Sequence, residues 1–375
     1  MINPKGFCDQ LTKFGIEFYC GVPDSLLKNL CAYIDENLSK EQHIITANEG
    51  NAVGLAMGRY LGSGTPAAVY MQNSGIGNAV NPLASLVDPE VYSIPMLLII
   101  GWRGEPGVSD EPQHVKQGRV TEQQLAILGI PYVIIDSQSD IDLVLAGLLK
   151  QMTDENRAVA ILVRKNTFRK PITAEIKPSL YQLKREDALT KLLQVFDSND
   201  VVISTTGKTS REVFELRKKR NEAASDFLTV GGMGHTSSIA MGVALGAPEK
   251  RVIAIDGDGS MLMHMGALPI IGQHCSSNLV HIVLNNQSHE SVGGQPTVAG
   301  EIDMEMLVKA SGYKAYYCAS DEESIASNWS SLTPNSGPVL FEIKIAQGSR
   351  DDLGRPTSSP IENKEAFMQH VGSEK

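Results

Sequence analysis

The sequence Asp-Gly-Asp-Gly-Ser at positions 256–260 constrains the fold of this chain more than any other feature. Residues 251–255 before it are mostly apolar and predict a buried strand, and residues 279–284 predict the next strand. Asp258 then follows the end of the first strand, and Asn286 follows the end of the second. Because neighbouring parallel strands end side by side, and open α/β sheets bind ligands at that edge, we expect these two side chains to meet in a binding site.

The residue types at this edge suit a diphosphate bridged by a metal ion. A carboxylate, an amide oxygen and a free backbone carbonyl form a half-shell of hard oxygen ligands, which Mg²⁺ prefers. Gly257 and Gly259 allow a sharp turn that leaves backbone N–H groups facing an anion at the start of a helix. Two alternatives are an ordinary Gly-Asp-Gly turn and a dinucleotide-binding loop, although Leu262 stands where the full dinucleotide motif has its third glycine.

The Gly-Asp-Gly-Ser sequence followed by paired asparagines resembles the cofactor motif of thiamine-diphosphate enzymes. That resemblance implies that Asp258, Asn286 and the carbonyl of Ser288 bind Mg²⁺. The usual spacing of the motif is slightly shorter, which leaves Asn285 as an alternative to Asn286. Four residues of the run would also contact the cofactor itself: Gly257, Asp258, Gly259 and Ser260.

Composition and charge favour a soluble enzyme. The chain has 375 residues, enough for two domains of ordinary size, and its 42% hydrophobic and 20% charged residues are typical of globular proteins. We find no membrane-spanning apolar run and no signal-peptide core at the N-terminus. The net charge of -10 argues against nucleic-acid binding, and five scattered cysteines fit reduced core residues. We therefore expect a cytoplasmic protein that binds neither nucleic acid nor membranes.

Both halves of the chain alternate strand-like and helix-like segments. Strands are predicted at 18–22, 43–46, 67–71, 95–100, 132–135, 158–163, 200–204, 227–230, 251–255, 279–284 and 338–345. This alternation predicts an α/β fold with two doubly wound, mostly parallel sheets, each covered by helices on both faces. We assign residues 1–170 to a first domain, the polar segment 171–183 to a linker, and residues 184–375 to a second domain.

This layout is similar to that of thiamine-diphosphate enzymes, in which a pyrimidine-binding domain precedes a diphosphate-binding domain. The linker is too short to hold the central third domain that many members carry. In the family the cofactor lies between one domain from each of two subunits. The resemblance therefore implies a homodimer or a higher homo-oligomer with active sites between subunits.

The resemblance also indicates a catalytic glutamate. The predicted strand near residues 43–46 is followed by Glu49 and then by a helix rich in small residues. In the family, a glutamate at this place hydrogen-bonds the pyrimidine ring of the cofactor and so promotes loss of the thiazolium C2 proton. We expect burial to raise the pKa of Glu49 so that it can share a proton. The alternative is that Glu49 only favours a helix N-terminus through the helix dipole.

Two loops of the second half match further cofactor contacts of the family. Gly232 and Met233 lie in a glycine-rich loop, where Met233 would be the apolar wedge that bends the cofactor; the alternative for Met233 is ordinary core filling. Thr206 and Gly207 would contact the cofactor by hydroxyl and backbone. A P-loop at this position is rejected, because Val202 replaces its first glycine.

Five further segments resemble phosphonopyruvate decarboxylases, and together they extend over nearly the whole chain. They are residues 21–25, 72–75, 101–104, 110–114 and 348–356. The resemblance implies non-oxidative decarboxylation of phosphonopyruvate to phosphonoacetaldehyde and CO₂ with thiamine diphosphate and Mg²⁺, a step of phosphonate biosynthesis. Asn73, in the second segment, is expected to contact the cofactor. Sulfopyruvate decarboxylases share several of these segments but are typically split into two subunits, so a single chain favours the phosphonate.

A substrate with two anionic groups requires cations in its pocket. Arginine suits a phosphonate because its guanidinium can bind bidentately, whereas lysine offers a point charge. Four cations are expected to bind the substrate: Arg103, Lys116, Lys208 and Arg350. His114, beside Glu111, and Asp24 are expected to act in catalysis, with His114 steering protons. His289, just after the metal loop, is a further candidate.

Several interpretations stay open at this level. The substrate could be sulfopyruvate or another 2-keto acid, although the basic loops argue against plain pyruvate. A synthase that joins the same intermediate to an acceptor is another possibility. A cofactor-binding protein without activity belongs to a different class, and the presence of Glu49 with an intact metal loop weighs against it. An α/β nucleotide-binding protein unrelated to thiamine is the remaining alternative.

Overall fold

The computed structural model describes residues 1–170, 180–275, 277–332 and 336–372. The chain divides into two compact units. The first comprises Met1–Ile176 and Ser291–Gln295, and the second comprises Lys177–Glu290 and Pro296–Lys375. Most of the linker predicted at 171–183 lies outside the described residues. The division predicted from the sequence lies at one linker and so misses one feature of the units. The short segment Ser291–Gln295 belongs to the first unit, although residues of the second unit precede and follow it in sequence.

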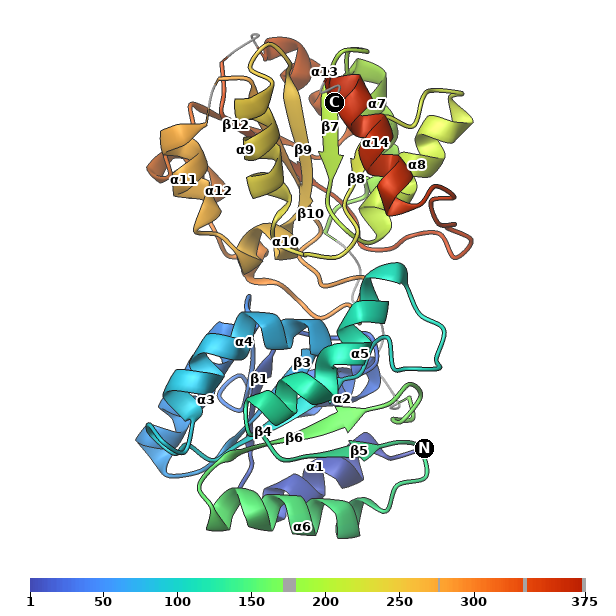
Figure 1. Ribbon diagram of the computed structural model, residues 1–375. Helices are drawn as coiled ribbons and strands as arrows, with labels where there is room; N and C mark the ends of the chain where they lie inside the picture. Colours follow the sequence, from blue (N-terminus) through green and yellow to red (C-terminus); the bar gives the residue numbers. More distant parts are fainter. Residues whose placement is uncertain (171–179, 276, 333–335, 373–375) are drawn as a thin grey trace. The chain divides into compact units, whose positions relative to one another are not determined.

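The first unit contains one sheet of six parallel strands in the order β2-β1-β3-β4-β6-β5 (Figure 1). The strands are β1 (Phe18–Gly21), β2 (His43–Ile45), β3 (Ala67–Gln72), β4 (Met96–Gly101), β5 (Tyr132–Ile135) and β6 (Ala158–Val163). The chain passes from β1 to the edge strand β2 and then returns to the other side of β1 to form β3. The carboxyl ends of β1 and β3 therefore border a topological switch point, where open α/β sheets bind ligands.

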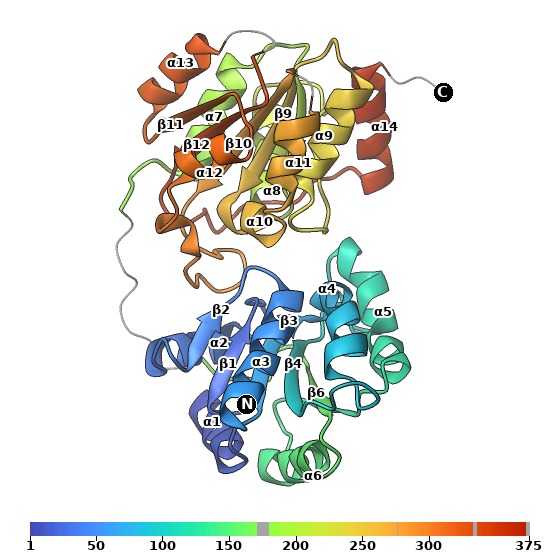
Figure 2. The same cartoon turned by 90° about the vertical axis from the view of Figure 1, so that its left-hand side faces the viewer.

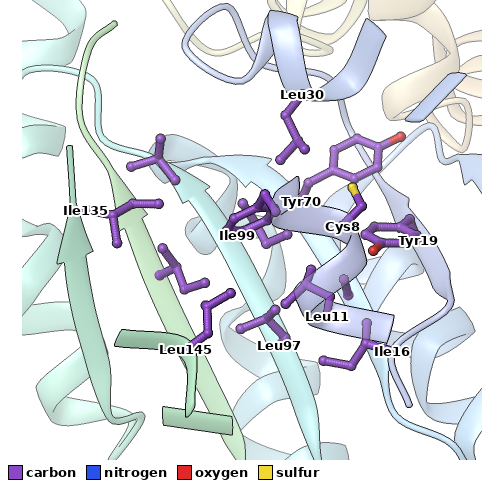
Figure 3. Close-up of a cluster of buried hydrophobic side chains, with 14 of the residues drawn as sticks. Cys8, Leu11, Ile16, Tyr19, Leu30, Tyr70, Leu97, Ile99, Ile135 and Leu145 are labelled. Atoms are coloured by element: carbon purple, nitrogen blue, oxygen red, sulfur yellow. The ribbon is translucent and has the colours of Figure 1, made fainter. Parts of the chain in front are cut away.

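Helices cover both faces of this sheet. One face carries α1 (Pro4–Lys13), α2 (Lys28–Asn37) and α6 (Ile141–Asp154), and the other carries α3 (Glu49–Ser63), α4 (Ile76–Pro82) and α5 (Pro112–Ile127). Figure 3 shows part of the first of these two cores, with Leu11, Leu30 and Leu145 from the three helices around Leu97 and Ile99 of β4. Since both faces are covered, β4 is buried along its whole length, which explains its uninterrupted apolar sequence.

The second unit contains a sheet of six parallel strands in the order β11-β12-β10-β9-β7-β8 (Figure 2). The strands are β7 (Val201–Ser204), β8 (Phe227–Leu228), β9 (Val252–Gly257), β10 (Leu279–Asn285), β11 (Ala315–Ala319) and β12 (Val339–Lys344). Here the chain leaves β7 for the edge strand β8 and returns to the other side of β7 as β9. The second switch point therefore lies between the carboxyl ends of β7 and β9.

Helices also flank this second sheet. One core is formed with α7 (Arg185–Val195), α8 (Lys208–Lys219) and α13 (Glu322–Ser331). Helix α9 (Thr236–Gly246) packs against β9, with α11 (Ala267–His274) beside it and α12 (Met304–Ala310) beside α11. The short α10 (Asp258–Met263) begins directly after β9, and α14 (Pro360–Val371) packs near β8.

The predicted fold class is confirmed, and each of the eleven predicted strands lies within two residues of an observed one. The twelfth strand, β11, was not predicted. It is an edge strand with the sequence Ala-Tyr-Tyr-Cys-Ala, and four of its five residues are at least partly exposed. An edge strand of this kind lacks the apolar run by which the buried parallel strands were found.

Three of the five cysteines are buried as expected, namely Cys8, Cys20 and Cys31, and all three are free thiols. Cys275 is only partly buried and Cys318 is exposed, so the expectation of core residues was wrong for Cys318. In the part of the chain that the structure describes, no helix combines the length and apolar character needed to cross a membrane.

Candidate active site

Glu49 is held in a tight cradle at the start of α3, directly after β2. Its side chain is buried, and Asn78 Nδ2 of α4 donates a hydrogen bond to Glu49 Oε2 at 2.7 Å. Gly75 packs so closely that a Cβ there would lie 2.4 Å from Glu49 Oε1. Burial raises the pKa of Glu49, and the hydrogen bond from Asn78 opposes that rise. A fixed carboxyl group with a raised pKa is suited to sharing a proton.

Asp24 is a fully buried carboxyl group that follows β1. The backbone N–H of Leu26 donates to Asp24 Oδ2 at 2.8 Å, whereas Oδ1 has no hydrogen-bond partner among the described residues. A Cβ at Gly101 would lie 2.0 Å from Asp24 Oδ2, which places Asp24 against the end of β4. Burial raises the pKa of Asp24 to about 6, so this group changes protonation close to neutral pH.

The raised pKa of Asp24 should make the fold less stable as the pH rises. The pKa of this carboxyl is about 6 in the fold against 3.8 ordinarily. Its contribution to stability is therefore lost as the pH rises from about 4 through about 6. We expect Asp24→Asn to escape this loss, so that its stability relative to the wild type rises by about 2 kcal/mol between pH 4.5 and pH 8, out of about 3 kcal/mol for the full shift. Denaturant unfolding of both proteins at pH 4.5 and pH 8 measures the gain. An equal difference at the two pH values would show that Asp24 ionises normally.

Arg103 and His114 converge on one carboxylate, that of Asp110. Arg103 Nε donates to Asp110 Oδ2 at 2.8 Å and Arg103 Nη2 to Oδ1 at 2.5 Å, while His114 Nδ1 lies 2.9 Å from Oδ1. Asp110 lies in the segment 110–114, one of those that resemble phosphonopyruvate decarboxylases, but Asp110 itself was not predicted to be functional. The other two residues of this cluster were predicted from their residue types.

The contact with Asp110 determines which nitrogen of His114 is available. Burial would raise the pKa of Asp110, but hydrogen bonds from Arg103 and His114 outweigh it and hold that pKa well below its usual range. Since an ionised carboxylate only accepts, the proton of a neutral His114 must lie on Nδ1, and Nε2 is left as the free ring nitrogen. Burial lowers the pKa of His114, so the imidazole is neutral at neutral pH.

Asn73, predicted to contact a cofactor, is fully buried beneath Arg103. Its Nδ2 donates to the carbonyl of Arg103 and to Thr121 Oγ1, both at 2.8 Å, and its Oδ1 accepts the N–H of Arg103 at 3.2 Å. Both amide protons are therefore used, one on the backbone of Arg103 and one on Thr121, and the contact with a cofactor stays a prediction. Lys116 lies on α5 two residues after His114, and its side chain is exposed.

Three loops of the second unit meet at the carboxyl edge of its sheet. Ser260 Oγ accepts hydrogen bonds from Thr205 Oγ1 at 3.2 Å and from the N–H of Gly234 at 3.1 Å. Thr206 Oγ1 accepts the N–H of Gly231 at 3.0 Å. The loops after β7, β8 and β9 are thereby tied together at the switch point, and they contain the predicted cofactor residues of this unit other than Asn286.

Met233 stands in a loop whose shape only glycines permit. Its neighbours Gly231, Gly232 and Gly234 have φ values of 78°, 60° and 89°, in the region that side chains disfavour. A Cβ at Gly259 would lie 3.5 Å from Met233 Cε and 3.1 Å from the ring of His289. Met233 and His289 therefore both reach the glycine of the Asp-Gly-Ser turn. Gly207, which precedes α8, also has a positive φ of 93°.

Asp258 is a buried carboxylate without a neutralising cation. Thr297 Oγ1 donates to Asp258 Oδ2 at 2.5 Å, and burial raises the pKa of Asp258 to about 6 although Thr297 and backbone N–H groups oppose the rise. Among the described residues, no lysine, arginine or histidine forms an ion pair with it. A divalent cation would supply the missing charge, so the residues present fit Mg²⁺. Thr297 was not predicted, since 39 residues separate it from Asp258.

The two asparagines after β10 point to different partners. Asn285 Nδ2 donates to Glu342 Oε1 at 2.6 Å, and Glu342 lies on β12, on the side of β10 away from β9. Asn286 uses its backbone N–H to bond the carboxylate of Asp258, and its Nδ2 donates to Glu290 at 2.9 Å. Strands β9 and β10 pair in parallel, so the expected proximity of Asp258 and Asn286 is confirmed. These contacts favour Asn286 over Asn285 as a ligand.

Ser288 completes this turn. Its N–H donates to Asn286 Oδ1 at 3.0 Å, and its buried hydroxyl has no hydrogen-bond partner among the described residues. Within those residues, no three His, Cys, Asp or Glu side chains gather as a metal site. The expected ligand set contains one carboxylate, one amide and one backbone carbonyl, so it would not form such a group and stays a prediction.

The two cations of this unit that were expected to bind substrate are paired with carboxylates. Lys208 Nζ donates to Glu290 Oε1 at 2.8 Å. Arg350 forms ion pairs with three acidic residues, namely Glu186, Glu215 and Asp352. Either cation would have to exchange a carboxylate for the anion of a substrate, so these two assignments stay predictions.

Comparison with known proteins assigns both units. Residues 5–127 match the family described as "Thiamine pyrophosphate enzyme, N-terminal TPP binding domain", and residues 205–343 match "Thiamine pyrophosphate enzyme, C-terminal TPP binding domain". The chain therefore belongs to the thiamine pyrophosphate enzyme family. Phosphonopyruvate decarboxylase of Streptomyces viridochromogenes is 33% identical over 387 residues, covering 99% of this chain and 95% of that one. The protein of that name from Streptomyces hygroscopicus is also 33% identical, covering 98% and 94%. Within the family, the chain is a thiamine-diphosphate-dependent decarboxylase.

A third relative removes one argument made from the sequence. Sulfopyruvate decarboxylase of Methanosarcina acetivorans is 28% identical over 398 residues, covering 100% of this chain and 99% of that one. A sulfopyruvate decarboxylase thus also exists as a single chain of this length. The presence of a single chain therefore does not favour phosphonopyruvate over sulfopyruvate as the substrate.

Proposed function

We propose that the chain decarboxylates phosphonopyruvate to phosphonoacetaldehyde and CO₂, using thiamine diphosphate and Mg²⁺. The observation that carries the proposal is the cluster of Arg103, Asp110 and His114 at the carboxyl edge of the first sheet. It supplies a guanidinium that can bind an anion and a neutral imidazole that can accept a proton. The 33% identity to two phosphonopyruvate decarboxylases over nearly the whole chain supports the same substrate.

The second unit would hold the cofactor by its diphosphate. Asp258, Asn286 and the carbonyl of Ser288 would bind Mg²⁺. The diphosphate would lie against the three joined loops, through Thr206, Gly207, Gly257, Gly259 and Ser260. Gly232 and Met233 would support the thiazolium ring. When bound, thiamine diphosphate supplies the electron sink that accepts the pair left by departing CO₂.

The first unit would handle protons and the substrate anion. Glu49 would share a proton with the pyrimidine ring of the cofactor through Oε1, since Oε2 is held by Asn78. Asp24, whose pKa is about 6, would supply the proton that replaces CO₂ in the product, and the unprotonated Nε2 of His114 would accept protons. Arg103 would bind the phosphonate through the N–H groups that Asp110 and Ser25 leave free, with Lys116 nearby on α5.

Sulfopyruvate is the second candidate substrate, favoured by the full-length relative from Methanosarcina acetivorans. Initial rates of CO₂ release from phosphonopyruvate, sulfopyruvate and pyruvate separate the candidates. We expect kcat/KM to be highest for phosphonopyruvate and lowest for pyruvate, which lacks the second anion. A preference for sulfopyruvate would retain the assignment of Glu49 and the metal loop but overturn that of the substrate.

We also propose that the enzyme is a homodimer or larger homo-oligomer in which each active site uses units from two chains. Glu49→Gln and Asp258→Ala each disable one unit, so neither variant should be active alone. After denaturation and refolding as an equal mixture, half of the dimers would combine the two variants and contain one intact site. We expect recovery of about a quarter of the wild-type activity. If each chain built its own sites, the mixture would stay inactive.

A further inference from the structure

The amide of Asn286 is oriented by an acidic residue outside the predicted ligand set. We propose that Glu290 is a positioning residue, which turns the oxygen of Asn286 toward the metal and joins the metal loop to the loop that precedes α8. The inference rests on the metal site proposed above and extends it to a residue with no part in the predicted chemistry.

The contacts of Glu290 determine the orientation of the Asn286 side chain. Asn286 Nδ2 donates to Glu290 Oε2 at 2.9 Å. An ionised carboxylate accepts hydrogen bonds and donates none, so it must face the NH₂ group of the amide and not its oxygen. Asn286 Oδ1 then points the other way, where it accepts the N–H of Ser288 at 3.0 Å. A carbonyl oxygen has two acceptor sites, so the second is available to a cation.

Glu290 is itself fixed by a buried ion-pair network. Arg185 Nη1 donates to Glu290 Oε2 at 3.1 Å, and Arg185 is held by two further hydrogen bonds to Glu212, at 2.6 and 2.8 Å. The side chains of Arg185 and Glu212 are only 7% and 1% exposed. The N–H of Gly348 also donates to Glu290 Oε2, at 3.1 Å. A carboxylate with this many partners in a buried place has little rotational freedom, as an orienting group requires.

The same carboxylate links two loops of the site. Lys208 Nζ donates to Glu290 Oε1 at 2.8 Å, and Lys208 is the first residue of α8, directly after Thr206 and Gly207. Glu290 follows Asn286 by four residues. One oxygen of Glu290 therefore holds the proposed diphosphate loop, and the other holds the proposed metal ligand. This arrangement also gives Lys208 a part that does not require direct contact with the substrate.

Glu290→Ala tests the inference, because it removes the oxygen that Asn286 Nδ2 faces and leaves the amide free to turn its own oxygen away from the metal. Glu290→Gln is the conservative comparison. Its one oxygen would take the place of Oε2, where Asn286, Arg185 and Gly348 all donate, and would keep Asn286 oriented. Mg²⁺ titration at a fixed, saturating concentration of thiamine diphosphate, followed by Tm, reports on that difference. We expect the Mg²⁺ concentration at half-saturation to rise roughly 10- to 100-fold in Glu290→Ala and to stay close to the wild-type value in Glu290→Gln.

Controls separate orientation from a general loss of structure. Glu305→Gln, in an exposed pair with Lys309 on α12 of the same unit, should leave the Mg²⁺ titration unchanged. High Mg²⁺ should restore the full rise of Tm in Glu290→Ala, since the ligands themselves are intact. A lower Tm without ligands but an unchanged half-saturation would overturn the inference and leave Glu290 a purely structural residue. If the wild type shows no Mg²⁺-dependent rise, the proposed metal site fails, and this inference fails with it.

Discussion

Glu49→Gln should lower kcat roughly 100- to 10,000-fold, which is the range expected for a missing proton-transfer group. Glutamine retains the size of glutamate and an oxygen that can accept from Asn78, so the cradle at the start of α3 should survive. What is lost is the ability to share a proton, for which burial and the raised pKa prepare this carboxyl. Steady-state decarboxylation measures kcat, and calorimetric titration measures the affinity for thiamine diphosphate.

The affinity of Glu49→Gln for thiamine diphosphate distinguishes a proton-sharing role of Glu49 from a role in binding the cofactor. We expect it to change little, because the diphosphate and the metal are assigned to the second unit. Glu36→Gln is a matched control, since Glu36 lies exposed on α2 of the same unit. Full turnover by Glu49→Gln would contradict the proton-sharing role. A loss of cofactor affinity as large as the loss of kcat would make Glu49 a binding residue.

Asp258→Ala should abolish the binding of Mg²⁺ and thiamine diphosphate, with at least about a 100-fold loss of Mg²⁺ affinity. That is the upper end of the loss observed when only a partner of a metal ligand is removed, and Asp258 is proposed as a ligand itself. Activity should fall to the same extent for every 2-keto acid, because the substitution acts on the cofactor. Retention of thiamine diphosphate after gel filtration, with and without added Mg²⁺, measures the effect.

The stability of the cofactor-free protein should respond differently to this substitution. Burial raises the pKa of Asp258 to about 6, so its charge weakens the fold as the pH rises through that value. Removing the carboxylate relieves that cost and also removes the hydrogen bond from Thr297, and we expect the two effects to offset. Asp351→Ala, at an exposed position of the same unit, is the control. A variant that changes substrate preference but retains its cofactor would contradict the metal assignment.

The backbone of both sites could be predicted because it follows from local patterns. The strands of both sheets except β11 are apolar runs or short β-rich segments, and glycines mark the turns after β9 and β8. Two strands with this spacing place Asp258 and Asn286 at neighbouring strand ends whatever the details of packing. The position of Glu49 follows in the same way, from a strand that precedes a helix of small residues.

The partners of these side chains could not be predicted, because they come from distant parts of the chain. Asn78 lies 29 residues from Glu49, and no local pattern links them. Arg103 and Asp110 are near in sequence, but nothing in the spacing shows that both oxygens of Asp110 are occupied by Arg103 and His114. Counting cations likewise overestimated those that are free, since Lys208 and Arg350 meet carboxylates only in the folded unit.

Purified protein incubated with phosphonopyruvate tests the central claim most directly, with phosphorus NMR following the substrate and a CO₂ assay following the carboxyl carbon. The account predicts one phosphonoacetaldehyde and one CO₂ for each phosphonopyruvate consumed, and this only when thiamine diphosphate and Mg²⁺ are both present. Omission of either, or chelation of the metal, should stop the reaction. Release of CO₂ that persists without the cofactor, or a bound cofactor with no turnover of phosphonopyruvate, would contradict it.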